Sequence, residues 1–86
     1  MEEQEIGLVD HFFDKISVGI IKLSGELKIG DTIHIKGKQA DFSQEITSMR
    51  IEFDEVTEAK EGDKVGIKVP QPIHANDTVY KVIAGE

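Results

Sequence analysis

The sequence contains no cysteine and no tryptophan, and its aromatic residues are four phenylalanines and one tyrosine. Without cysteine, disulfide bonds, thiolate metal ligands and a cysteine nucleophile are all excluded, a composition typical of proteins of the reducing cytoplasm. No apolar run approaches the roughly 18 residues that a membrane-spanning helix requires. The first residues, MEEQEIG, are acidic where a secretory leader would be basic. We therefore expect a soluble, cytoplasmic protein with no membrane partner.

Motifs for catalysis, nucleotide binding and metal binding are also missing from the sequence. There is no Gly-x4-Gly-Lys-Ser/Thr loop to bind a nucleotide phosphate and no Gly-x-Ser-x-Gly nucleophile elbow. The three histidines, His11, His34 and His74, are not spaced as metal ligands. The acidic run from Glu52 to Asp63 lacks the Asp-x-Asp/Asn-x-Asp/Asn-Gly order of a calcium loop. We predict no catalytic residue, no nucleotide, no metal and no cofactor.

The 86 residues suffice for one domain, and a domain of this length buries only about 60% of the surface that its unfolded chain exposes. We expect a single domain over residues 1–86, with frayed tails at 1–4 and 84–86. Hydrophobic residues make up 38% of the chain, and isoleucine, valine and leucine are the main ones available for a core. Side chains of this kind pack well on pleated strands, so the composition favours a β structure.

One short pattern occurs three times: Gly or Asn, then Asp, then a polar residue, then alternating apolar residues. The copies lie in the stretches LKIGDTIHIKG, AKEGDKVGIKV and IHANDTVYKV. Glycine adopts positive φ without the cost of about 1–2 kcal/mol that a Cβ brings, and asparagine also tolerates this region. An aspartate side chain can accept hydrogen bonds from nearby backbone amides. We therefore predict three tight turns, with the structural residues Gly30, Asp31, Gly62, Asp63, Asn76 and Asp77.

Alternating apolar residues predict short strands around these turns. The runs Ile6–Phe13 and Ile16–Leu23 flank Asp14–Lys15 with the spacing of a tight hairpin. In the second run both faces carry apolar side chains, as expected where a barrel closes or where a partner covers the strand. After two of the turns the alternation points five residues inward, namely Ile33, Ile35, Val65, Ile67 and Val69.

The stretch Gln44–Phe53 changes phase, because its apolar residues belong to two different registers. A β-bulge near Ser48–Met49 would reconcile them. Over residues 52–60 we favour a strand followed by a loop, and a short helix is the alternative because apolar residues there also recur at helical spacing. About six strands with regularly spaced turns predict an all-β fold, a small closed antiparallel β-barrel, since closure removes exposed sheet edges.

In chain order, LKIGDTIHIKG, QEITSMRIEFDEVTEAKEGDKVGIKV and NDTVYKV resemble the second, β-barrel domain of translational GTPases of the elongation factor Tu type. More particularly, the chain resembles stand-alone translation elongation factor-like proteins, from about Ile6 to Val82. The resemblance implies a noncatalytic binding module without a GTPase domain, which would associate with the ribosome, tRNA or an RNA-modifying assembly. Similar barrels are attached to larger enzymes, including collagenase-like peptidases. This implies the alternative of a protein-interaction adapter or accessory barrel.

The net charge of -7 is unevenly distributed along the chain. Residues 14–38 carry five lysines against three acidic residues, whereas residues 39–63 carry two basic residues against eight acidic ones. This balance weighs against nucleic-acid binding, whose affinity comes largely from lysine and arginine. The candidates for RNA binding are Lys36, Lys38, Arg50 and Lys64. A protein partner is the alternative, and the sequence leaves the oligomeric state open.

Overall fold

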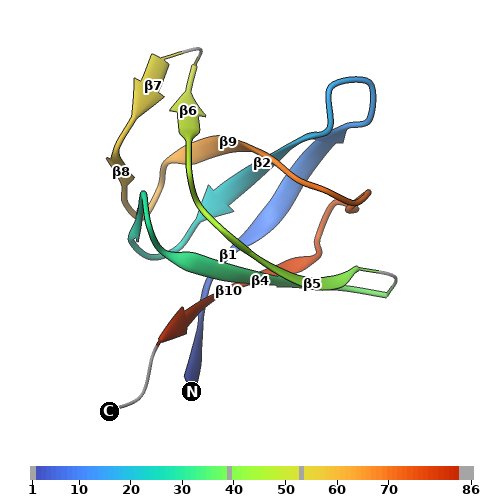
Figure 1. Ribbon diagram of the computed structural model, residues 1–86, viewed down its shortest axis with the longest axis horizontal. Coiled ribbons are helices and arrows are strands. Elements are labelled where there is room, and N and C mark those ends of the chain that lie inside the picture. Colours follow the sequence, from blue (N-terminus) through green and yellow to red (C-terminus); the bar gives the residue numbers. More distant parts are fainter. Residues whose placement is uncertain (1, 39, 53, 84–86) are drawn as a thin grey trace.

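The computed structural model describes residues 2–38, 40–52 and 54–83 (Figure 1). Within these ranges the regular secondary structure consists of strands without any helix, so the prediction of an all-β fold is confirmed. The same ranges therefore contain no helix that could cross a lipid bilayer. The strands are β1 (Glu2–Phe13), β2 (Val18–Leu23), β3 (Leu27–Lys28), β4 (Thr32–Lys36), β5 (Asp41–Glu45), β6 (Met49–Ile51), β7 (Asp54–Val56), β8 (Glu58–Ala59), β9 (Lys64–Lys68) and β10 (Thr78–Ile83).

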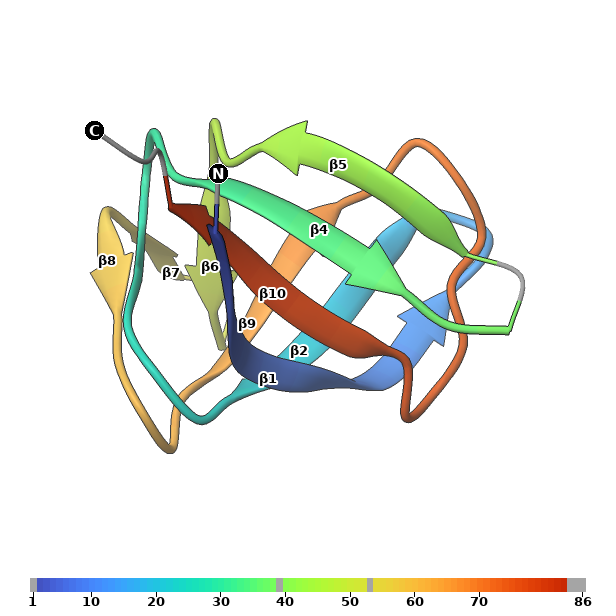
Figure 2. The same cartoon turned by 90° about the horizontal axis from the view of Figure 1, so that it is seen from below.

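Eight of the strands form one antiparallel sheet in the order β5-β4-β10-β1-β2-β9-β6-β7, and β3 pairs with β8 separately. The sheet curls around the core (Figure 2). The closed barrel is not confirmed, because β5 and β7 are the sheet edges and no ladder among the described residues joins them. The chain does pass directly from β5 to β6 through residues 46–48. In addition, the Gln44 side-chain amide of β5 donates a hydrogen bond of 2.9 Å to the Lys68 carbonyl of β9.

The core lies inside this curled sheet and consists mostly of isoleucine and valine. The five residues that the alternation pointed inward are all buried, with exposed fractions between 0% and 3%, so this prediction is confirmed. Phe12 and Phe42 are partly buried and pack against the same cluster. Branched aliphatic side chains on alternate strand positions therefore supply most of the buried surface, as the composition predicted.

The first hairpin forms between β1 and β2, but its turn is longer than predicted. The ladder ends where Phe13 pairs with Val18, and residues 14–17 make the turn. Ser17 has a φ of 57°, and its carbonyl accepts a hydrogen bond of 2.8 Å from the N–H of Val69. Because this left-handed residue closes the turn, Ile16 lies in the turn rather than in β2 and is 60% exposed.

The predicted strand over residues 44–53 is divided into β5 and β6, which corrects the expectation of a bulge near Ser48–Met49. Ile46 and Met49 are both buried, with exposed fractions of 1% and 0%. Residues three positions apart point to opposite faces of a regular strand, so the strand has to break for both to reach the core. The helix considered for residues 52–60 is wrong, because the described residues there form β7 and β8. Phe53 lies outside the described residues.

Bulges occur instead in β1, at two places where its pairing register shifts. One shift lies between Glu5 and Gly7 against β10, and the other lies between Val9 and His11 against β2. The N-terminal part of β1 also differs from the expected frayed tail, because residues 2–4 pair with residues 81–83 of β10. The other residues of the two expected tails, 1 and 84–86, lie outside the described residues.

Candidate functional site

The three repeated turns share one geometry. In each, a backbone N–H donates to the aspartate carboxylate three residues later, over 2.9 Å, 3.1 Å and 2.9 Å for Lys28–Asp31, Lys60–Asp63 and His74–Asp77. The aspartate N–H donates back to the carbonyl of the same residue over 3.1 Å, 3.0 Å and 3.1 Å. The residue before each aspartate has a positive φ, which is 96° at Gly30, 93° at Gly62 and 76° at Asn76. Turn geometry thus accounts for the glycine, asparagine or aspartate at all six positions.

The turn that contains Asp77 packs closely against the turn after β4. Asp77 is only 8% exposed, and a Cβ added at Gly37 would lie 2.0 Å from its Oδ1 atom. Next to this contact is an open depression of about 560 Å³, lined by residues 36–38 and 74–78. The Asp77 carboxylate already accepts the hydrogen bond from His74, so its position serves the turn.

The four basic residues proposed from the sequence lie in two separate places. Lys36 ends β4 and Lys38 follows it, at the rim of the depression beside Asp77. Arg50 of β6 is opposite Gly66 of β9, and Lys64 lies two positions earlier on β9. Three strands, β10, β1 and β2, separate β4 from β9 in the sheet. The structure therefore places Arg50 near Lys64 on neighbouring strands, whereas Lys36 and Lys38 lie beside the Asp77 turn.

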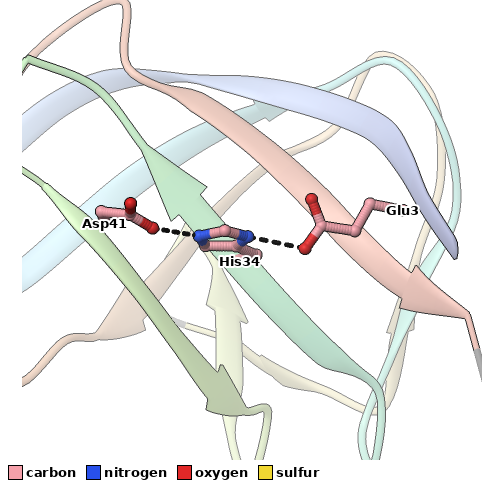
Figure 3. A network of polar contacts seen from close by, with 3 residues as sticks. All are labelled: Glu3, His34 and Asp41. Atoms are coloured by element: carbon pink, nitrogen blue, oxygen red, sulfur yellow. Dashed lines mark hydrogen bonds and ion pairs between the residues drawn. The ribbon is translucent and has the colours of Figure 1, made fainter. Parts of the chain in front are cut away.

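His34 forms a cluster of polar contacts across the outer face of the sheet (Figure 3). Its Nδ1 atom lies 2.6 Å from Glu3 Oε2 of β1, and its Nε2 atom lies 2.5 Å from Asp41 Oδ1 of β5. The hydrogen bond to Asp41, followed by that to Glu3, raises the pKa of His34 above its usual value. The bond to His34 in turn lowers the pKa of Asp41. Ionised carboxylates only accept hydrogen bonds, so one beside each ring nitrogen favours the imidazolium form, in which both nitrogens carry a proton.

This cluster is suited to linking strands rather than to catalysis. Because both nitrogens of His34 are engaged, neither is available as a general base or a metal ligand. Among the described residues, no group of three or more histidine, cysteine or carboxylate side chains is arranged to hold a metal ion. The cluster was not predicted, since strand alternation gives the direction of a side chain but not its neighbours across the sheet.

The outer face of the β1–β2 hairpin carries a group of exposed apolar side chains that we call the hairpin surface: Phe13, Ile16, Val18 and Ile20. Phe13 is 45% exposed and Ile16 60%, while Val18 and Ile20 are half-buried. The His11 ring lies against Phe13, with 4.6 Å between ring centroids. The inner face of β2 is also apolar, because Ile21 and Leu23 are buried in the core. The sequence contained this signal, as apolar residues occupy both faces of the second run.

Basic residues border the hairpin surface on successive rungs of the sheet. We call these residues the basic rim: Lys22, Arg50, Lys64 and Lys68. Lys68 lies opposite Val18, and Gly66 lies opposite both Ile20 and Arg50. Lys22 and Lys64 pair with each other on the next outward-facing rung. Lys64 also approaches Asp10, with 3.7 Å between Nζ and Oδ2.

Comparisons with known proteins identify a similar curated protein and similar solved structures. No protein-family model matches the chain. A protein of Methanocaldococcus jannaschii named as an uncharacterized protease is 44% identical over 77 residues, which are 88% of this chain and 19% of that protein. The chain thus spans about a fifth of the length of the curated relative that it matches.

Two solved structures show the same fold. One is the C-terminal domain of a candidate U32 peptidase from Geobacillus thermoleovorans, which superposes with a TM-score of 0.86 at 20% identity and covers 93% of both chains. The other is the selenomethionine variant of that domain, with a TM-score of 0.84, 20% identity, and coverage of 88% of this chain and 96% of the other. The chain is therefore similar in fold to a small all-β domain that lies at the end of a longer protein.

These matches overturn the expected relation to translation factors. The relatives are a protease and the C-terminal domain of a U32-type peptidase, rather than the second domain of elongation factor Tu-type GTPases. The resemblance was built on the Gly-Asp turns and the strands after them. Such turns serve the corners of many small β-domains, so they did not discriminate between the two families.

Proposed function

We propose that this domain is a noncatalytic accessory domain that docks onto the larger part of a peptidase-type protein. The observation that carries the proposal is the 44% identity to a protease over a segment that makes up only 19% of that protein. A segment of this size, with a fold also known as a separate C-terminal domain, is a module attached to a larger body. The protein-interaction function inferred as an alternative from the sequence is therefore favoured.

The noncatalytic part of the proposal is supported by how the polar groups are used. His34 is engaged by two carboxylates, and Asp31, Asp63 and Asp77 accept hydrogen bonds from the backbone of their own turns. A catalytic acid or base needs a position within hydrogen-bond reach of a substrate, usually in a concave site. The depression beside Asp77 is open to solvent, and its one buried carboxylate is committed to the turn. The cytoplasmic location stays a prediction of the sequence.

A chimera tests this proposal. In it, the matching 77-residue segment of the M. jannaschii protease is replaced by this chain. Docking stabilises the folded domain, so the most protected amides of β4 and β10 should exchange hydrogen more slowly in the chimera than in the isolated chain, by about tenfold or more. Hydrogen exchange read by mass spectrometry resolves the peptides of the two parts. Equal exchange rates in the chimera and in the isolated chain would refute docking.

A further inference from the structure

We propose that the hairpin surface is the face by which the domain docks, and that its counterpart on the larger part of a peptidase-type protein is an apolar recess bordered by carboxylates. This inference rests on the proposed function and specifies where the contact lies. Phe13 and Ile16 would enter the recess, and the basic rim would meet the acidic border. Aromatic and aliphatic anchors surrounded by polar residues are the usual anatomy of such interfaces.

The backbone of the hairpin turn and the side chains of Val18 and Ile20 are held in place before any partner binds. The Ser17 carbonyl is bonded to the N–H of Val69, which fixes the turn that presents Ile16. Gly66 has no side chain, and an added Cβ there would lie 3.3 Å from Ile20 and 3.4 Å from Val18, so both side chains lie across this position. Gly19, on the opposite face of β2, packs against Ile73. Side chains that are fixed in advance lose less conformational entropy on docking.

The position of the hairpin leaves it accessible to a large partner. In both ribbon views the β1–β2 turn lies at the opposite end of the domain from the paired ends of β1 and β10 (Figures 1 and 2). The match covers only 19% of the M. jannaschii protein, so about four-fifths of that protein lies outside the matched segment. That larger part is big enough to cover the hairpin surface. Within this chain, no described residue covers the hairpin surface.

Charge decides which kind of partner fits. The basic rim stands out in a chain whose net charge is -7, and its four cations outnumber the carboxylates beside it, Asp10 near Lys64 and Glu55 opposite Arg50. A twofold contact with a second copy of this chain would bring two basic rims into one interface, and like charges close together are unfavourable. A carboxylate-bordered surface is attracted instead. RNA would also be attracted to the rim, but phosphate contacts leave the apolar anchors Phe13 and Ile16 in water, so a protein surface fits better.

Two double variants, each carried by the chimera described above, locate the contact. In the first, Phe13→Ser and Ile16→Ser remove the anchors. In the matched control, Ile29→Ser and Ile83→Ser alter side chains that are 39% and 38% exposed elsewhere on the domain. The anchor variant should lose the slowed hydrogen exchange in β4 and β10, while the control should retain it. Both variants should leave the exchange of the isolated chain nearly unchanged, because the altered side chains are exposed in it.

This chain contains no cysteine, so an introduced cysteine, followed on the peptide that carries it, provides a second readout. The thiol of Ile16→Cys should react with a maleimide at least about tenfold more slowly in the chimera than in the isolated chain, whereas the thiol of Ile29→Cys should react equally in both. Bulk RNA added to the isolated chain should leave both rates unchanged, and light scattering should show the isolated chain as a monomer.

The outcomes separate the two proposals. If the unaltered chimera shows no slowed exchange, both the accessory function and the docking face are wrong. If the slowed exchange survives the anchor variant, or if only the Ile29→Cys thiol is protected, the domain docks but through another face, and only this inference is overturned. Protection of Ile16→Cys by RNA or by self-association would also overturn it.

Discussion

Substitution of Gly37 by alanine tests the packing of the Asp77 turn. The Cβ of an alanine at this position would lie 2.0 Å from Asp77 Oδ1 and 2.3 Å from Cγ, which no real contact allows. The φ of Gly37 is not positive, so the backbone itself accepts alanine and the cost comes from the clash alone. Asp77 is 8% exposed and its carboxylate holds the His74 N–H at 2.9 Å, so it cannot turn away without losing that bond.

The magnitude follows from these two costs. Overpacking costs about 1–3 kcal/mol, and losing a hydrogen bond to a charged group costs about 1.5–3 kcal/mol. Alanine also lowers the conformational entropy of the unfolded chain relative to glycine, which stabilises the folded domain by about 0.4–1 kcal/mol. We therefore expect Gly37→Ala to lower the free energy of unfolding by about 2–4 kcal/mol. In a domain of this size the melting temperature should fall by about 10 °C or more.

Urea unfolding followed by far-ultraviolet circular dichroism measures this change, provided that the slope against urea stays constant. The decisive control is Asp77→Ala, which removes the atoms in the clash. In that background Gly37→Ala should cost less than about 0.5 kcal/mol, so the two substitutions should be strongly non-additive. If Gly37→Ala costs the same with and without the Asp77 carboxylate, the close packing of the two turns is not the reason for the glycine.

Three further predictions concern other parts of the domain. The folded pKa of His34 is raised, so the stability that His34 contributes to the domain is complete below about pH 6.5 and is lost as the pH rises through the folded pKa. The folded pKa of Asp41 is lowered, so the stability that Asp41 contributes is present above about pH 3.9 and is lost as the pH falls through the folded pKa. The urea midpoint should therefore decline from about pH 5.5 to about pH 9 by more than it does in His34→Gln, and parallel curves would contradict this role. Ile21→Ala, at a side chain that is 0% exposed, should cost about 2–5 kcal/mol in the same unfolding assay, and a cost below about 1 kcal/mol would contradict its place in the core. Gly62→Ala meets no atom within 4 Å but requires a φ of 93°, so it should cost about 1–2 kcal/mol, and a neutral result would contradict strain at this turn.

The features predicted from the sequence are those that depend on a few neighbouring residues. Alternation placed Ile33 and Ile35 in the core, and the Gly-Asp and Asn-Asp pairs marked turns, because pleat and turn geometry act over two to four residues. In the sequence, the break between β5 and β6 is indicated only by a change of phase in the apolar residues of Gln44–Phe53. Whether a bulge or a break resolves such a change depends on where Ile46 and Met49 meet the core, which is a tertiary contact.

The His34 cluster could not be predicted because it depends on the order of strands in the sheet. His34 and Glu3 are 31 residues apart, and β10, from the end of the chain, lies between their strands. The alternation of β4 gives the direction of the side chain but not its neighbours. The hairpin surface was more accessible to prediction, since apolar residues on both faces of one strand indicate either closure or a partner, and the structure shows that the side chains on the outer face are exposed or half-buried.

The relation between the turns and the mistaken family resemblance has a physical explanation. The residues that carried the resemblance, such as Gly30–Asp31 and Gly62–Asp63, satisfy a backbone conformation and two local hydrogen bonds, which any small curled sheet needs at its corners. They constrain the fold and leave the function open. The outward-facing residues, such as Phe13 and Ile16 beside the basic rim, are not required by any turn or by the core. Exposed apolar residues reduce solubility and add little to the stability of the isolated domain, so the docking proposed above would give them a role, and it is at these residues that it can be tested.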